Sequence, residues 1–176
     1  MSIALITGSC GLIGSESAYF FSSKGLDIVG IDNNLRQLFF GKDGSTDWQK
    51  KKLKDKIKSY KHFSTDIRSY SNLEKIFKKF RKNISIIIHC AAQPSHDYGK
   101  NFPILDFDVN AKGTLNMLEL TKLYCPSAVF IHMSTNKVYG DNPNKLNIIE
   151  HRKRWELKKS NNNYNGIKES FSLDNC

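Results

Sequence analysis

Three glycines and one distant carboxylate are the residues whose spacing first suggests chemistry. Gly8, Gly11 and Gly14 follow the apolar run Ile3-Ala4-Leu5-Ile6, and Asp32 stands further along, after a second short apolar run. A strand, a glycine turn and a helix in this order offer free backbone N–H groups to phosphates. An acid about 20 residues past the glycines can accept both hydroxyls of an adenosine ribose. The pattern predicts a dinucleotide site.

Each glycine has its own reason in such a turn. Gly8 allows the tight turn, Gly11 lets the backbone approach a pyrophosphate, and Gly14 lets the helix pack close to the strand. The spacing is Gly-x-x-Gly-x-x-Gly, one residue longer than the commonest dehydrogenase pattern. Asp32 would repel a 2′-phosphate, which favours NAD over NADP. The alternative is a purely structural turn that binds nothing.

The rest of the chain alternates strands and helices. The apolar patterns predict further strands at 27–31, 62–66, 84–89 and 128–133, and helices at 71–82 and 101–124. Residues 33–46 are predicted as a loop with an exposed-looking Leu38-Phe39-Phe40. A helix should begin near Asp47, with Trp48, Leu53 and Ile57 as its buried side. This order predicts an α/β fold, a Rossmann-like, doubly wound parallel sheet.

Two parts of the chain differ in composition. Residues 1–140 carry the strand and helix patterns and form the predicted NAD-binding domain, whereas residues 141–176 are rich in asparagine and lysine. The second part is predicted to be a loop-rich tail.

Ligands of such a sheet bind at the carboxyl ends of its strands. The side chains that follow the later strands are therefore candidates: Asp66, Ile67, Ala91, Ala92, Gln93 and Thr135. The small alanines would let a cofactor pass close to the backbone, and Thr135 supplies a hydroxyl. In the alternative interpretation the alanines only pack a turn and Thr135 only caps a strand.

Composition bounds the possible partners. The chain has 176 residues and a formal net charge of +10. Its basic clusters lie in or beside amphipathic patterns and lack the interleaved aromatics of single-strand binders, so we expect no nucleic-acid role. No apolar run approaches the length of a membrane span, and Met1 leads directly into the first strand. We therefore expect a cytoplasmic protein that does not bind membranes.

Cysteine and histidine spacing favours no metal site. The four cysteines include no C-x-x-C pair, and the five histidines show no ligand spacing with them. We expect reduced, structural thiols, with Cys10 as a small filler of the glycine turn. His89 and His132 are expected to be hydrogen-bonded core residues.

Several motifs together resemble a known family. They are TGSCGLIG (7–14), Asp32, Asp66-Ile67, HCAA (89–92), DVNAKGT (108–114) and MSTNKVYGD (133–141). The chain resembles the extended short-chain dehydrogenase/reductases, and within them the NAD-dependent sugar-nucleotide epimerases and dehydratases. STNKVYGD and NGIKESFSLD are similar to the CDP-paratose (CDP-tyvelose) 2-epimerase branch.

The resemblance implies a role for each matching residue. Gly8, Gly11 and Gly14 would wrap the pyrophosphate together with Leu12 and Ile13, and Asp32 with Asn33 would hold the adenosine ribose. Asp66 and Ile67 would flank the adenine, while Ala91, Ala92 and Gln93 would line the dinucleotide. Asn110 would brace the helix near the active site. Thr135 would hydrogen-bond the sugar hydroxyl that is oxidised, as the catalytic Ser/Thr of the family does.

The chain departs from the family at its catalytic pair. The family uses Tyr-x-x-x-Lys on one helix, which puts both side chains on one face. Tyr164 and Lys168 have this spacing, but Gly166 between them disfavours a helix, and the segment aligns better with a loop before the motif. We interpret the pair as a coincidence, so that the sheet is incomplete and the catalytic helix and substrate lobe are missing.

Two functions remain open. The first is a sugar-nucleotide epimerase, CDP-paratose 2-epimerase-like, or a 4,6-dehydratase, of which this chain is the cofactor-binding portion. A nucleotide sugar would be its substrate, and a homodimer is possible because family members often dimerise through the helix at 101–124. The second is a truncated module that binds NAD without catalysis.

Overall fold

The computed structural model describes residues 2–173 and divides the chain into two compact units, Met1–Met133 and Ser134–Cys176. The division falls seven residues before the boundary predicted at residue 140, directly after the fifth strand. Each unit has its own secondary structure.

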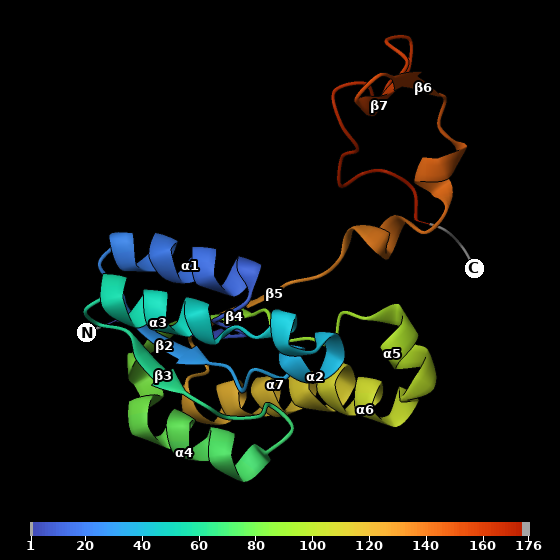
Figure 1. The fold of residues 1–176 in the computed structure, drawn as a ribbon. Coiled ribbons are helices and arrows are strands. Elements are labelled where there is room, and N and C mark those ends of the chain that lie inside the picture. Colours follow the sequence, from blue (N-terminus) through green and yellow to red (C-terminus); the bar gives the residue numbers. More distant parts are fainter. Residues whose placement is uncertain (1, 174–176) are drawn as a thin grey trace. The chain divides into compact units, whose positions relative to one another are not determined.

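The first unit is built on a parallel sheet (Figure 1). Its strands are β1 (Ile3–Thr7), β2 (Asp27–Ile31), β3 (Lys61–Phe63), β4 (Ile84–His89) and β5 (Val129–His132), arranged in the order β3-β2-β1-β4-β5. All neighbouring strands pair in parallel. The strand order reverses between β1 and β4, and ligands of open α/β sheets bind at such a switch point. The predicted Rossmann-like fold is confirmed.

Helices cover both faces of this sheet. Helices α1 (Leu12–Ser23) and α3 (Asp47–Lys56) lie on one face, and α4 (Tyr70–Phe80) and α7 (Gly113–Tyr124) on the other (Figure 1). Successive residues of β1 alternate between the two cores: Leu5 packs with Phe77 of α4, and Ile6 packs with Leu53 of α3. Burial on both faces explains why the first strand is a continuous apolar run.

Short elements connect these helices to the strands. They are α2 (Arg36–Phe40), α5 (His96–Asn101), α6 (Pro103–Phe107), a π-helical turn at Asp108–Lys112, and the 3₁₀ turns Lys42–Gly44 and Arg81–Asn83. The helix predicted at 101–124 thus exists from residue 103, with a π turn inside it. The segment predicted as a loop contains α2, and the expectation for Trp48 was wrong, since 67% of its surface is exposed while Gln49 is buried.

One face of β5 presents exposed apolar side chains. Val129 and Ile131 are 58% and 37% exposed, whereas Phe130 between them packs against the core beneath the opposite face. Alternation along a strand therefore turns Val129 and Ile131 to a face that is exposed within residues 2–173.

The second unit contains the 3₁₀ turns Asn136–Tyr139 and Asn142–Lys145 and an antiparallel pair, β6 (Ile148–His151) with β7 (Arg154–Leu157). The sequence indicates only loop here, because the hairpin strands are exposed and carry charged residues where a buried strand would carry apolar ones.

Candidate functional site

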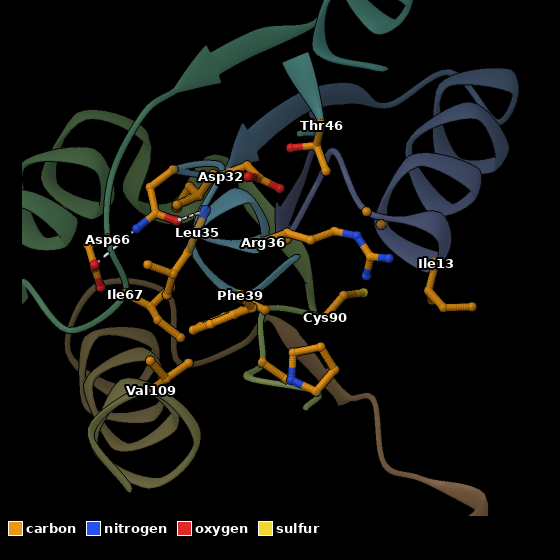
Figure 2. Close-up of a pocket in the computed structure, with 18 of the residues that line it drawn as sticks. Ile13, Asp32, Leu35, Arg36, Phe39, Thr46, Asp66, Ile67, Cys90 and Val109 are labelled. Carbon is orange, nitrogen blue, oxygen red and sulfur yellow. Dashed lines mark hydrogen bonds between the residues drawn. The ribbon is translucent and has the colours of Figure 1, made fainter. Parts of the chain in front are cut away.

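A cavity opens where the carboxyl ends of β1, β2 and β4 meet (Figure 2). Of the thirteen predicted cofactor residues, eleven line it: Gly8, Gly11, Leu12, Ile13, Gly14, Asp32, Asn33, Asp66, Ile67, Ala91 and Ala92. The fold thus brings together residues that span 85 positions of sequence, from 8 to 92.

The glycine turn forms one wall of the cavity, and the three glycines are needed for different reasons. Gly8 has a φ of 63°, and a Cβ added there would lie 2.9 Å from the Ala91 nitrogen. A Cβ on Gly14 would lie 2.1 Å from the Gly8 carbonyl oxygen, whereas one on Gly11 would approach that oxygen only to 3.3 Å. Gly8 and Gly14 are therefore required by the protein's own packing, and Gly11 keeps backbone accessible to the cavity.

The first turn of α1 is prepared for an anion. Gly11 is its N-cap residue, no side chain caps the helix, and its first turn contains no acidic residue. Open N–H groups and the positive end of the helix dipole favour a negatively charged group there.

Asp32 ties the turn to the end of β2. Its Oδ2 accepts a hydrogen bond from the Cys10 backbone N–H at 2.9 Å, and its Oδ1 accepts one from the Asn34 N–H at 2.8 Å. Each carboxylate oxygen retains a further lone pair, so the group can still accept hydroxyl hydrogens from the cavity. The sequence predicts that Asp32 accepts ribose hydroxyls, but it does not predict that Asp32 holds the glycine turn through the Cys10 N–H.

Asp66 is held by Arg68. The Arg68 Nε and Nη2 donate to the two carboxylate oxygens at 3.0 and 2.6 Å, and Asn33 adds a bond at 3.0 Å. Burial opposes ionisation, but these bonds outweigh it and hold the pKa of Asp66 below its ordinary value. Asp66 therefore contributes a fixed, largely compensated charge at the cavity edge.

Gln93 and Asn110 are the two predicted residues that do not line the cavity. Asn110 lies in the π-helical turn, where its Oδ1 accepts the Gln93 backbone N–H at 2.9 Å and its Nδ2 donates to Asp106 at 3.1 Å. The Gln93 Nε2 also donates to Asp106, at 2.7 Å. Both residues fix the loop after β4. That Asn110 braces the helix near the active site stays a prediction.

A buried chain of hydrogen bonds runs beneath this loop. The Ala91 N–H donates to Thr7 Oγ1, and the Thr114 hydroxyl donates to the Asn110 carbonyl. His89 lies between the two hydroxyls, with Nδ1 2.7 Å from Thr7 and Nε2 3.0 Å from Thr114. Since the Thr114 proton is engaged, Nε2 must carry the ring proton and Nδ1 must accept from Thr7. The prediction of a hydrogen-bonded core residue is confirmed for His89 and is wrong for His132, which is exposed at the end of β5.

The neutral state of His89 matters for the cavity wall. A neutral ring with one donor and one acceptor satisfies both hydroxyls, whereas a protonated ring would leave Thr7 facing a second donor. Ala91 lines the cavity at one end of the chain of bonds, and Asn110 accepts at the other. Protonation at Nδ1 would therefore disturb Thr7 and the Ala91 N–H bonded to it, whereas the contact of Nε2 with Thr114 would remain.

Sequence reasoning missed nine lining residues: Ile31, Leu35, Arg36, Phe39, Thr46, Thr65, Cys90, Pro94 and Val109. Most of them contribute apolar wall that no motif marks. The sequence groups Phe39 with two exposed-looking neighbours, but its ring packs edge-on against Tyr98 of α5, with centroids 4.7 Å apart. The periodicity of a five-residue helix is too short to reveal this.

Thr135 lies in the second unit, where its hydroxyl accepts the Lys137 N–H at 3.3 Å. Tyr164 and Lys168 lie in turns and irregular chain, and Gly166 between them has a φ of 123°. Their spacing therefore does not place them on one helix face.

Cys10 is 3% exposed, and burial raises the pKa of its thiol to about 11, which suits a filler. Within residues 2–173, no group of three or more His, Cys, Asp or Glu side chains could hold a metal ion. In the same part of the chain, no helix has the length and apolar character needed to cross a membrane.

The sequence model of the GDP-mannose 4,6 dehydratase family matches residues 5–154. CDP-paratose 2-epimerase of Salmonella typhi is 33% identical over 97% of this chain and 46% of its own length. The chain thus spans less than half the length of this relative.

Solved structures agree with the fold. UDP-glucose 4-epimerase of Bifidobacterium longum, in complex with NAD⁺ and UDP, superposes with a TM-score of 0.68 at 23% identity, over 90% of this chain and 43% of that one. UDP-glucose 4-epimerase of Thermus thermophilus, in complex with NAD, superposes with a TM-score of 0.54 at 32% identity, over 69% of this chain and 34% of that one.

We predict that Gly14→Ala lowers the melting temperature much more than Gly11→Ala does. Gly14→Ala should strongly destabilise the first unit because its Cβ would overlap the Gly8 carbonyl, whereas Gly11→Ala should leave the melting temperature within a few degrees. Thermal unfolding followed by circular dichroism measures both. Equal melting temperatures would contradict the packing role assigned to Gly14.

We predict that the stability of the first unit falls as the pH drops from about 6.5 to about 4. Burial, and secondarily the charge of His132, lowers the His89 pKa to about 4. The unfolded chain binds this proton near its ordinary pKa of 6.5 and the folded chain does not, so acid favours unfolding in that window, by roughly 3 kcal/mol in all. Urea unfolding at several pH values measures the slope, which His89→Gln should flatten. An NMR titration of the His89 ring near 6.5 would refute the lowered pKa.

Proposed function

Because the chain belongs to the NAD-dependent epimerase/dehydratase family of extended short-chain dehydrogenase/reductases, we propose that it is the cofactor-binding portion of a sugar-nucleotide epimerase. The observation that carries the proposal is the cavity itself. The glycine turn, the open end of α1 and the Asp32 carboxylate all face it.

NAD is the cofactor that fits this cavity. The residues present match its parts: free N–H groups for a pyrophosphate, a carboxylate for ribose hydroxyls, and an apolar wall with Ile67 and Val109 for a base. When bound, NAD would supply a hydride acceptor for oxidation of a sugar carbon and a hydride donor for its reduction.

The chain's own residues would bind the cofactor and orient the sugar. The α1 end and the glycine turn would bind the phosphates, Asp32 would orient the ribose, and Asn110 would keep the loop after β4 in place through Gln93. Thr135 would donate to or accept from the sugar hydroxyl that is oxidised. The proton acceptor would be a tyrosine of a Tyr-x-x-x-Lys helix in the rest of the protein, because Tyr164 and Lys168 do not share a helix.

The substrate is proposed to be a nucleotide sugar of the CDP-paratose 2-epimerase type. The likeness to the Salmonella typhi protein over 97% of this chain supports this choice. A sugar-nucleotide 4,6-dehydratase is the second candidate, favoured by the family model that matches residues 5–154. A module that binds NAD without catalysis is the third, since the helix pair is absent from residues 2–173.

Calorimetric titration of the chain with NAD and NADP tests the proposal. We expect NAD to bind more tightly than NADP. Asp32→Asn should weaken the affinity for NAD about tenfold and reduce the ratio of NAD to NADP affinity, because the amide lacks the negative charge that repels a 2′-phosphate. Thr135→Ala should leave NAD affinity nearly unchanged. A chain that binds neither dinucleotide would refute the proposal.

The same titration separates enzyme from module. NAD binding without turnover of a nucleotide sugar supports the module for the chain alone, and turnover by the full-length protein supports the epimerase. Loss of a measurable activity in Tyr164→Phe would show that Tyr164 is the catalytic tyrosine.

We also propose a homodimer through the continuous helical segment 103–124. Ile104, Phe107, Leu115 and Leu118 recur at helical spacing and are all exposed, with Ile104 at 77% and Phe107 at 65%. Large exposed apolar side chains gathered on one helical segment are typical of a surface that another chain covers. A second copy of the chain presents the same side chains, as a twofold interface requires.

Analytical ultracentrifugation tests the dimer. We expect the chain to sediment as a dimer and Leu115→Lys/Leu118→Lys as a monomer, because two charges would be buried without partners. Leu123→Lys, which is exposed on another face of α7, is the control and should leave the dimer intact. A wild-type chain that stays monomeric at high concentration would exclude this interface.

A further inference from the structure

The cavity lining contains a basic side chain to which the glycine turn and Asp32 give no role. Its lining includes two carboxylates, Asp32 and Asp66, and Arg36 is the one basic residue among the described residues that line it. Asp66 is paired with Arg68, and Asp32 accepts two backbone N–H groups. Arg36 is therefore the side chain left to compensate an anion in the cavity.

Arg36 is held over the cavity and is not engaged by a carboxylate. It begins α2, and its guanidinium lies 4.7 Å from the Phe40 ring centroid. Within residues 2–173, no ion pair joins it to an acid. Its side chain extends from α2 toward Ile13 in the first turn of α1 (Figure 2).

Helix α2 is placed by contacts that leave this arginine available. The helix has no buried residue, and Phe39 packs against Tyr98, which in turn packs against Phe102 with centroids 4.5 Å apart. The aromatic contacts thus hold α2 beside the cavity, while Arg36 points across it.

We infer that Arg36 binds the pyrophosphate of the cofactor from the side opposite the α1 N-terminus. This inference rests on the proposed function. The helix end supplies N–H groups without a formal charge, and a guanidinium adds a planar, permanently charged donor set that suits phosphate oxygens. Arg36 is a cofactor-binding residue on this account, and α2 carries it.

Binding measurements with fragments of the cofactor test the inference. In Arg36→Gln, the dissociation constants for NAD and ADP should rise roughly ten- to hundredfold, whereas that for adenosine, which lacks phosphate, should stay within about twofold. Arg36→Lys should recover part of the loss. Lys42→Gln, which removes an equal charge just after α2 from a residue outside the cavity lining, is the control and should change none of the three.

The outcomes separate this inference from the proposed function. NAD binding that is unchanged in Arg36→Gln overturns the inference and leaves the proposed function standing. Equal weakening of adenosine and ADP also overturns it, because the side chain would then act on the nucleoside or on the placement of α2. A wild-type chain that does not bind NAD overturns both. Calorimetry for NAD and ADP, and NMR titration for weakly bound adenosine, provide the constants.

Discussion

The close approach of backbone at the glycine turn is the constraint on which the rest of the first unit depends. The turn after β1 touches the start of α1 on one side and the end of β4 on the other, at distances that leave no room for a Cβ on Gly14 or Gly8. The helix can therefore begin almost at the strand, and its N-terminus faces the switch point of the sheet. An anion site follows from that geometry alone.

Charge is distributed over this backbone frame with each acidic group already engaged. Asp32 holds the turn through the Cys10 N–H, so the residue that would recognise a ribose also positions the turn that would bind the phosphates. Two roles in one carboxylate mean that a change at Asp32 affects both parts of a dinucleotide. The pair of Asp66 with Arg68 fixes the far edge of the cavity and leaves little net charge there.

The sequence predicted the backbone elements around the cavity better than the side chains that line it. The glycine turn, Asp32 and the alternation of strands and helices could be predicted because each follows from local backbone requirements that leave a residue type or a period in the sequence. Arg36, Phe39 and Val109 could not, because they reach the cavity through tertiary packing of short elements. Trp48 shows the same limit: periodicity places it on the inner face of α3, yet Gln49 is buried instead. The hairpin of the second unit was missed because its strands have no buried face.

All residues that line the cavity lie in the first unit, and Thr135 lies in the second. On the proposed function, cofactor binding and the contact of Thr135 with the sugar would thus be encoded in separate compact parts of the chain. The walls of the cavity come from strands and helices that pack against one another within Met1–Met133, so its shape requires no residue of the second unit. On the proposed function, affinity for NAD would therefore depend on the first unit alone and would persist in variants of the second unit that lose catalysis.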